Sequence, residues 1–127
     1  MGRTGIGTRG MNVVAEVLRR LPGPMEWLEL PDGGSVRLRV TSWERGSAEI
    51  ERRRIEPVGR AEIPVLRLHL WQGYKDYPPN YYDLGSKTLQ AQLLPMLLER
   101  GYENYVYVIT KFGRAPKARY TVEKVPL

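Results

Sequence analysis

The residues of this 127-residue chain with the clearest chemical potential are tyrosines and cations near its C-terminal end. Between Gly101 and Val125, the runs 104–110 and 117–125 alternate in side-chain character and are rich in Tyr, Val, Ile and Thr, as strands are. The joint 111–116 contains Gly and Pro and favours a turn. We therefore predict a β-hairpin whose tyrosines can stack on bases and whose cations can contact phosphates.

The register of this hairpin decides which side chains are exposed, because a slip of one residue exchanges the two faces of a strand. In the first register Val106 and Val108 belong to the core, and an aromatic and cationic platform faces solvent. That platform would consist of Tyr105, Tyr107, Lys117 and Arg119. In the second register the tyrosines, with Tyr120, are packing residues, and Arg119 lies beside the two valines. We predict the first register.

The charge balance of the chain favours a polyanionic partner. There are 20 Lys and Arg residues against 14 Asp and Glu, which gives a formal net charge of +6. Arginine outnumbers lysine by 15 to 5, and its planar fork suits phosphates and bases. A GC-rich or thermophilic genome explains this composition equally well, since the chain also has no cysteine and few Asn and Gln residues.

Several classes of chemistry are excluded or disfavoured by residue content. The absence of cysteine excludes disulfides, Cys-ligated zinc and thiol nucleophiles, and the single histidine, His69, excludes a His cluster. The glycines at positions 5, 7 and 10 match a nucleotide-binding spacing but lack the strand that must precede them. We therefore predict a protein that is not an enzyme and that uses neither cofactor nor metal. An acid/base site built from Asp, Glu, Tyr and Lys stays open, because it leaves no local signature.

The N-terminal sequence has charges but no apolar core after them, so we do not expect it to be a secretory signal. No apolar run in the chain approaches the roughly 20 residues that span a bilayer. We expect no membrane association and an intracellular location, either cytoplasmic or as an intracellular viral product. Residues 1–10 hold four glycines and two arginines and are expected to form a flexible basic arm.

Residues 11–127 are expected to form a single α+β domain, with a mostly antiparallel sheet of five to six strands and two helices. Asn12 caps the expected first helix at about 13–21, and Ser86 caps the second at about 86–100, which is kinked near Pro95 and packed on the sheet. The remaining expected strands are 25–30, 35–43, 47–55 and 63–71, with a turn at 44–46 and a loop at 72–83.

The tyrosine-rich loop 72–83 and the hairpin supply most of the predicted binding surface, with arginines from strand 35–43. The residues predicted to bind nucleic acid are Arg37, Arg39, Tyr74, Lys75, Tyr77, Tyr105, Tyr107, Lys111, Arg114, Lys117 and Arg119.

The segment 113–122, GRAPKARYTV, resembles the Gly-x-small-x-(Lys)-x-Arg-Tyr-x-Val hairpin of small phage and archaeal single-stranded-DNA-binding proteins outside the OB family. The preceding helix entry, YYD…SKTLQAQL, is similar in character, so that the resemblance covers about the last third of the chain. It implies a single-stranded nucleic-acid binder in which Arg119 and Tyr120 contribute. We therefore predict a binder of single-stranded DNA, or less readily of RNA. The alternative is a structural or protein-interaction subunit without a nucleic-acid role, homodimeric through the leucine-rich helix.

Overall fold

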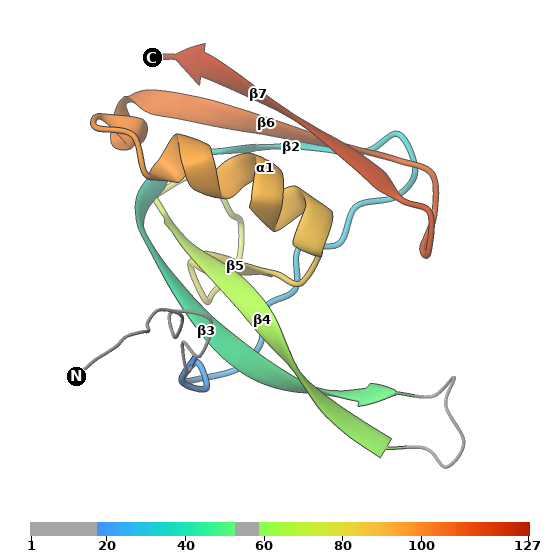
Figure 1. Cartoon of the computed structure of the whole chain (residues 1–127). Coiled ribbons are helices and arrows are strands. Elements are labelled where there is room, and N and C mark those ends of the chain that lie inside the picture. Colours follow the sequence, from blue (N-terminus) through green and yellow to red (C-terminus); the bar gives the residue numbers. More distant parts are fainter. Residues whose placement is uncertain (1–17, 53–58) are drawn as a thin grey trace, which may run out of the picture.

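A computed structural model describes residues 18–52 and 59–127 of the chain (Figure 1), so that the expected basic arm at 1–10 lies outside the described residues. The elements are β2 (Ser35–Leu38), β3 (Val40–Arg52), β4 (Gly59–Leu70), β5 (Tyr81–Leu84), α1 (Lys87–Leu97), the 3₁₀ turn η2 (Tyr102–Asn104), β6 (Tyr105–Phe112) and β7 (Arg119–Pro126). None of the helices in these ranges has the length and apolar character needed to cross a membrane.

The strands form two antiparallel three-stranded sheets, with the orders β2-β6-β7 and β3-β4-β5. The α+β class and the antiparallel pairing are therefore confirmed, but the prediction of one continuous sheet is wrong. The predicted strand 35–43 is interrupted at Arg39, where the chain leaves one sheet and enters the other (Figure 1). The backbone carbonyl of Arg39 accepts a hydrogen bond from the Trp71 amide at 2.9 Å, just beyond the end of β4.

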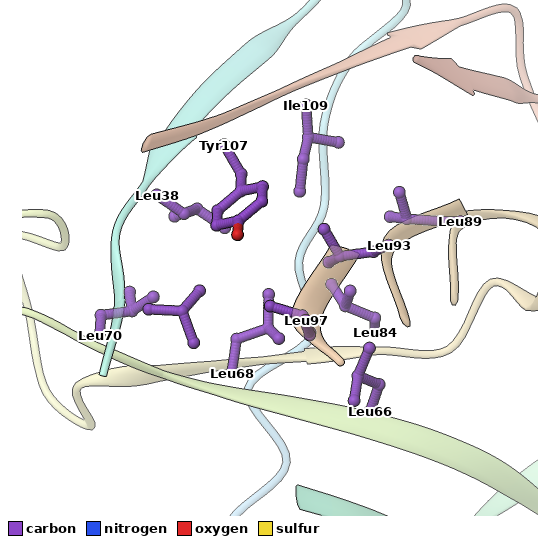
Figure 2. Packing of buried hydrophobic residues seen from close by; sticks show 11 residues of the cluster. Leu38, Leu66, Leu68, Leu70, Leu84, Leu89, Leu93, Leu97, Tyr107 and Ile109 are labelled. Carbon is purple, nitrogen blue, oxygen red and sulfur yellow. The ribbon is translucent and has the colours of Figure 1, made fainter. Parts of the chain in front are cut away.

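Helix α1 lies between the two sheets and supplies the centre of the main hydrophobic core (Figure 2). Its buried leucines are Leu89, Leu93 and Leu97. They pack with residues of both sheets, namely Leu38, Tyr107 and Ile109 from one, and Leu66, Leu68, Leu70 and Leu84 from the other. Each fully buried leucine contributes about 1.5–3 kcal/mol to folding. Because the chain itself covers these helical leucines, a homodimer through α1 would have to use the remaining surface of the helix.

The predicted start of the second helix is confirmed, because the Ser86 hydroxyl accepts a hydrogen bond from the Leu89 amide at 3.2 Å. The helix ends earlier than predicted, at Leu97 rather than Arg100. Pro95 lies inside the last turn without ending the helix, because the amide that it lacks would have bonded the Ala91 carbonyl further back. The last turn closes with the Leu98 amide donating to the Leu94 carbonyl at 3.0 Å, and Gly101 then turns the chain with a φ of 82°.

Strand β4 is central in its sheet and alternates, with Leu66, Leu68 and Leu70 in the main core and Val65 in a second core on the other face. The predicted turn at 44–46 is wrong, because β3 runs through these residues without interruption. Gly46 has a packing role instead: a Cβ atom on it would lie 2.5 Å from Cγ of Leu21, which packs against β3. The end of the predicted strand 47–55 lies outside the described residues.

The segment before β2 covers the second face of the β3-β4-β5 sheet. The predicted helix at 13–21 begins outside the described residues, and its described part, 18–21, is not helical. Leu21 donates its amide to the carbonyl of Ser47 at 3.1 Å and joins a small second core with Ala48 and Val65. The predicted strand 25–30 is reduced to an isolated bridge between Trp27 and Asp83.

A buried ion pair holds this segment on the sheet. The guanidinium of Arg67 donates two hydrogen bonds to the carboxylate of Asp83, at 2.7 and 3.2 Å, and both side chains are buried. It also donates to the backbone carbonyls of Pro22 at 2.6 Å and Pro24 at 3.4 Å, and it stacks 3.9 Å from the ring centre of Tyr81. The buried guanidinium of Arg67 therefore has a carboxylate to balance its charge and carbonyl oxygens to accept its remaining hydrogen bonds.

We predict that Asp83→Ala lowers the free energy of unfolding by about 3–5 kcal/mol, because it leaves the buried charge of Arg67 unpaired. Urea denaturation followed by circular dichroism measures the change. Glu62→Ala is the matched control, since Glu62 is an exposed strand residue whose ion pair with Arg20 lies at the surface. A loss below about 1 kcal/mol for Asp83→Ala would contradict a structural role for the buried pair.

Candidate nucleic-acid interface

The hairpin adopts the second of the two registers considered above, so the predicted register is wrong. In the pairing of β6 with β7, Tyr107 lies opposite Lys124 and Ile109 lies opposite Val122, and directly opposed residues share a face. Tyr107 is only 1% exposed and packs in the main core (Figure 2). Its hydroxyl donates to the carbonyl of Tyr102 at 2.8 Å, which satisfies the polar atom that burial would otherwise leave unpaired.

Two further predicted residues lie on this same core-facing side of the sheet. Tyr105 is half-buried against the core, and the ammonium of Lys124 lies 4.4 Å from its ring centre. Lys111 is half-buried and lies opposite Tyr120, which also packs against the core. The predicted platform of Tyr105 and Tyr107 beside Arg119 therefore does not exist.

The opposite side of the β2-β6-β7 sheet, called here the outer face, carries a different set of side chains. The pairing of β6 with its two neighbours places on this face Ser35, Arg37, Val106, Val108, Thr110, Phe112, Arg119, Thr121, Glu123 and Val125. Phe112 is 48% exposed and lies directly opposite the exposed Arg119. An aromatic ring and a guanidinium are thus side by side at the hairpin end of the outer face.

The outer face is exposed because helix α1 lies against the other side of the sheet (Figure 1). Gln92 of the helix donates to the carbonyl of Tyr120 at 2.8 Å, which fixes the helix beside β7. Figure 1 shows no other helix or strand over the outer face, although Val106 within this face is only 4% exposed. The exposure of this face is uneven, because Val106 is buried and Val108 half-buried, whereas Arg37, Phe112 and Arg119 are exposed.

The loop between β6 and β7 adds two exposed cations, Arg114 and Lys117, next to the outer face. The loop is tied to the turn before β2: the Gly113 amide donates to the carboxylate of Asp32 at 2.8 Å, and the Gly33 amide donates to the carbonyl of Lys111, also at 2.8 Å. These bonds hold the tip of the hairpin against a neighbouring turn.

Arg39 belongs to a separate aromatic and cationic contact. Its guanidinium lies 4.2 Å from the ring centre of Trp71, which is 41% exposed, and its Nε donates to the carbonyl of Glu103 at 3.3 Å. Such a pair offers a second exposed stacking surface.

The predicted binding residues of the 72–83 loop lie close together, but Lys75 contacts Glu26 and Tyr77 within the protein and does not face a polyanionic ligand. The side chain of Lys75 has no exposed surface; its ammonium lies 3.3 Å from the Glu26 carboxylate and 4.4 Å from the ring centre of Tyr77. Tyr74 is half-buried against the main core. Lys75 is therefore not available to nucleic acid, which corrects the prediction for this residue, whereas Tyr74 keeps part of its surface exposed. The loop also contains strand β5, which the sequence did not predict.

Two exposed aromatic residues, Phe112 and Trp71, were missing from the predicted set. The signal for Phe112 was present, because the alternation of β6 extends through it and places it opposite in phase to Tyr105 and Tyr107. The turn predicted at 111–116 includes Phe112, whereas the structure continues strand β6 through this residue. Nothing in the sequence around Trp71 indicates an exposed stacking surface. Its ring becomes a candidate only through the contact with Arg39, which the fold brings to it.

The buried phenols predict how the stability of the chain depends on pH. Burial, with nearby carboxylates and other tyrosines, raises the pKa of Tyr107 to about 12, and burial with the neighbouring Tyr77 does the same for Tyr82. An unfolded tyrosine ionises near pH 10. The folded chain therefore keeps this stabilisation below about pH 10 and loses it as the pH rises from about 10 through about 12.

We predict that the urea midpoint falls steeply over this alkaline range and that Tyr107→Phe makes the fall shallower. At neutral pH the same variant costs about 1 kcal/mol of stability, because the hydrogen bond to Tyr102 is lost. Tyrosinate absorbance measured in parallel gives the ionisation directly. Ionisation of all eight tyrosines in a single step near pH 10, without unfolding, would contradict the burial of Tyr107 and Tyr82.

Comparisons with known proteins found no match to this chain among protein-family models, curated proteins or solved structures. A proposal for its function therefore rests on the surface chemistry described above.

Proposed function

We propose that this chain binds single-stranded nucleic acid across the outer face of the β2-β6-β7 sheet, with single-stranded DNA preferred over RNA. The observation that carries the proposal is the exposed Phe112 directly opposite Arg119. Single-strand binders combine such rings, on which bases stack, with cations that follow the phosphates. The preference for DNA rests on the resemblance of residues 113–122.

The charges around this pair favour a phosphate backbone. Arg119 lies opposite the ring, Arg114 and Lys117 lie in the adjoining hairpin loop, and Arg37 lies farther along the outer face, opposite Val108. All four cations are exposed. Glu123 is the carboxylate on the outer face itself, and Asp32 lies at the hairpin tip, so the surroundings of Phe112 keep an excess of positive charge. Attraction of this kind is sequence-independent and weakens with added salt, because phosphate contacts release counterions.

A single strand suits this surface better than duplex DNA. Reading a major groove requires a helix with exposed polar and basic residues. Helix α1 has Lys87 as its only charged residue and buries its leucine stripe between the sheets. The outer face is an open sheet surface, on which unpaired bases can lie flat against a ring.

We predict that Phe112→Leu weakens binding to a labelled oligothymidine by about 5- to 150-fold, which corresponds to about 1–3 kcal/mol for one stacked base. Fluorescence anisotropy at low salt measures the affinity. Tyr77→Leu is the matched control, because Tyr77 is also a half-exposed aromatic residue but lies away from the sheet. Equal losses for the two variants, or no binding by the unmodified chain, would contradict the proposed site.

We further predict that the logarithm of the affinity falls with the logarithm of the salt concentration with a slope of about −3, if the four cations each contact a phosphate of a single strand. Arg119→Ala should make the slope shallower by about 0.7, whereas Arg60→Ala, which removes an exposed arginine from the start of β4, should leave it unchanged. A slope near zero would show that phosphates are not contacted. Tighter binding of oligouridine than of oligothymidine would contradict the preference for DNA.

A further inference from the structure

A pocket of about 290 Å³ lies apart from the outer face and has a lining of opposite character. It is lined by Glu26, Trp27, Glu29, Tyr77 and Tyr82. The lining therefore consists of two carboxylates and three aromatic rings, with no cationic residue among its members. The lining is thus acidic on a chain whose formal net charge is +6.

The pocket is built on firmly held backbone. Glu26 donates its amide to the Asp83 carboxylate at 2.8 Å and accepts the Asp83 amide at 2.7 Å, while the Leu28 amide donates to the Asp83 carbonyl at 3.0 Å. These bonds fix the segment that carries Glu26 and Glu29 beside strand β5, which carries Tyr82. The backbone that carries Glu26 is thus held by Asp83, the residue that also pairs with Arg67.

The walls of the pocket already stabilise one ammonium group, that of Lys75. Its Nζ atom lies 4.4 Å from the ring centre of Tyr77 and 4.8 Å from that of Tyr82, and 3.3 Å from an oxygen of Glu26. It donates a hydrogen bond to the carbonyl of Pro79 at 2.5 Å. Burial of a lysine with 0% exposed side chain requires such compensation, which the Glu26 carboxylate and the two rings supply although Lys75 itself does not line the pocket.

Negative charge remains after Lys75 has been counted. Lys75 offsets Glu26, which leaves the exposed Glu29, and Asp76 is exposed close by. The phenol of Tyr82 contributes no charge at neutral pH, because burial, Tyr77 and the nearby carboxylates raise its pKa to about 12. An incoming cation therefore meets a net negative lining with aromatic faces.

We propose that this pocket binds an organic ammonium group, carried either by a small molecule or by a lysine side chain. The Glu29 carboxylate supplies the charge that attracts the group, and the rings of Tyr77 and Tyr82 hold its methyl or methylene surface by cation–π contact. A nucleic-acid phosphate would be repelled here. The proposal is independent of nucleic-acid binding by the outer face, and each can fail without the other.

Choline and its neutral isostere 3,3-dimethylbutan-1-ol separate charge recognition from shape. Each is titrated into the millimolar range and followed by ¹H–¹⁵N NMR of the Trp27 indole and the amides of Glu29 and Tyr77, with sodium chloride keeping the ionic strength equal. We expect saturable shifts with choline and none with the isostere. Butylammonium represents the lysine side chain: tighter binding than choline points to a lysine donor, and weaker binding points to a free quaternary cation. Equal shifts from choline and isostere, or no shift with either cation, would overturn the proposal.

Two variants test the roles assigned to the lining. Glu29→Gln should weaken binding of the ammonium probe about two- to fivefold, as expected for an exposed ion pair, whereas Glu123→Gln removes the same charge from the outer face and should have no effect. Tyr77→Leu should weaken binding about tenfold by removing one aromatic face. Unchanged affinity in both Glu29→Gln and Tyr77→Leu, with folded NMR spectra, would also overturn the proposal.

Discussion

The burial of one face of each sheet against helix α1 is the constraint on which the rest of the structure depends. The β3-β4-β5 sheet has its second face covered as well, by the segment that the Arg67–Asp83 ion pair holds in place. The β2-β6-β7 sheet has no such cover among the described residues. Whether a side chain of β6 or β7 points to the core therefore depends on its position in the alternation of the strand. Tyr107 packs in the core, and Phe112 faces outward.

Much of the local structure could be predicted from the sequence, because it depends on nearby residues. The cap at Ser86 and the two faces of β4 follow from residue types at fixed spacings. Residue types do not determine which face of β6 is buried, because tyrosine and valine alternate along the strand and both can form a core. Tyr107 is suited to the inside only because a backbone carbonyl, that of Tyr102, lies within reach of its hydroxyl. No glycine or proline marks Arg39, where the chain passes from one sheet to the other. Gly46 suggests a turn in the sequence, but it lies within β3 and lets Leu21 pack closely against that strand.

Lys75 illustrates why a candidate site is harder to predict than an element. A lysine among tyrosines in a loop has the composition of a nucleic-acid contact, yet the fold brings Glu26 to it from another part of the chain and converts the cluster into an internal cation site. The structure thus separates two surfaces of opposite charge. The outer face offers cations around Phe112, and the pocket beside β5 offers carboxylates around aromatic rings. Ligands of opposite charge are expected at the two places, without competition between them.

The central claim is that the outer face of the β2-β6-β7 sheet is the nucleic-acid surface. Mapping the amide chemical-shift changes of the full chain on titration with unlabelled oligothymidine at low salt tests this most directly. We expect the largest changes to cluster at Arg37, Phe112, Arg119 and the loop between β6 and β7, with little change around Glu29 and Tyr77. Changes centred on the pocket, or spread evenly without a cluster on β6 and β7, would contradict it.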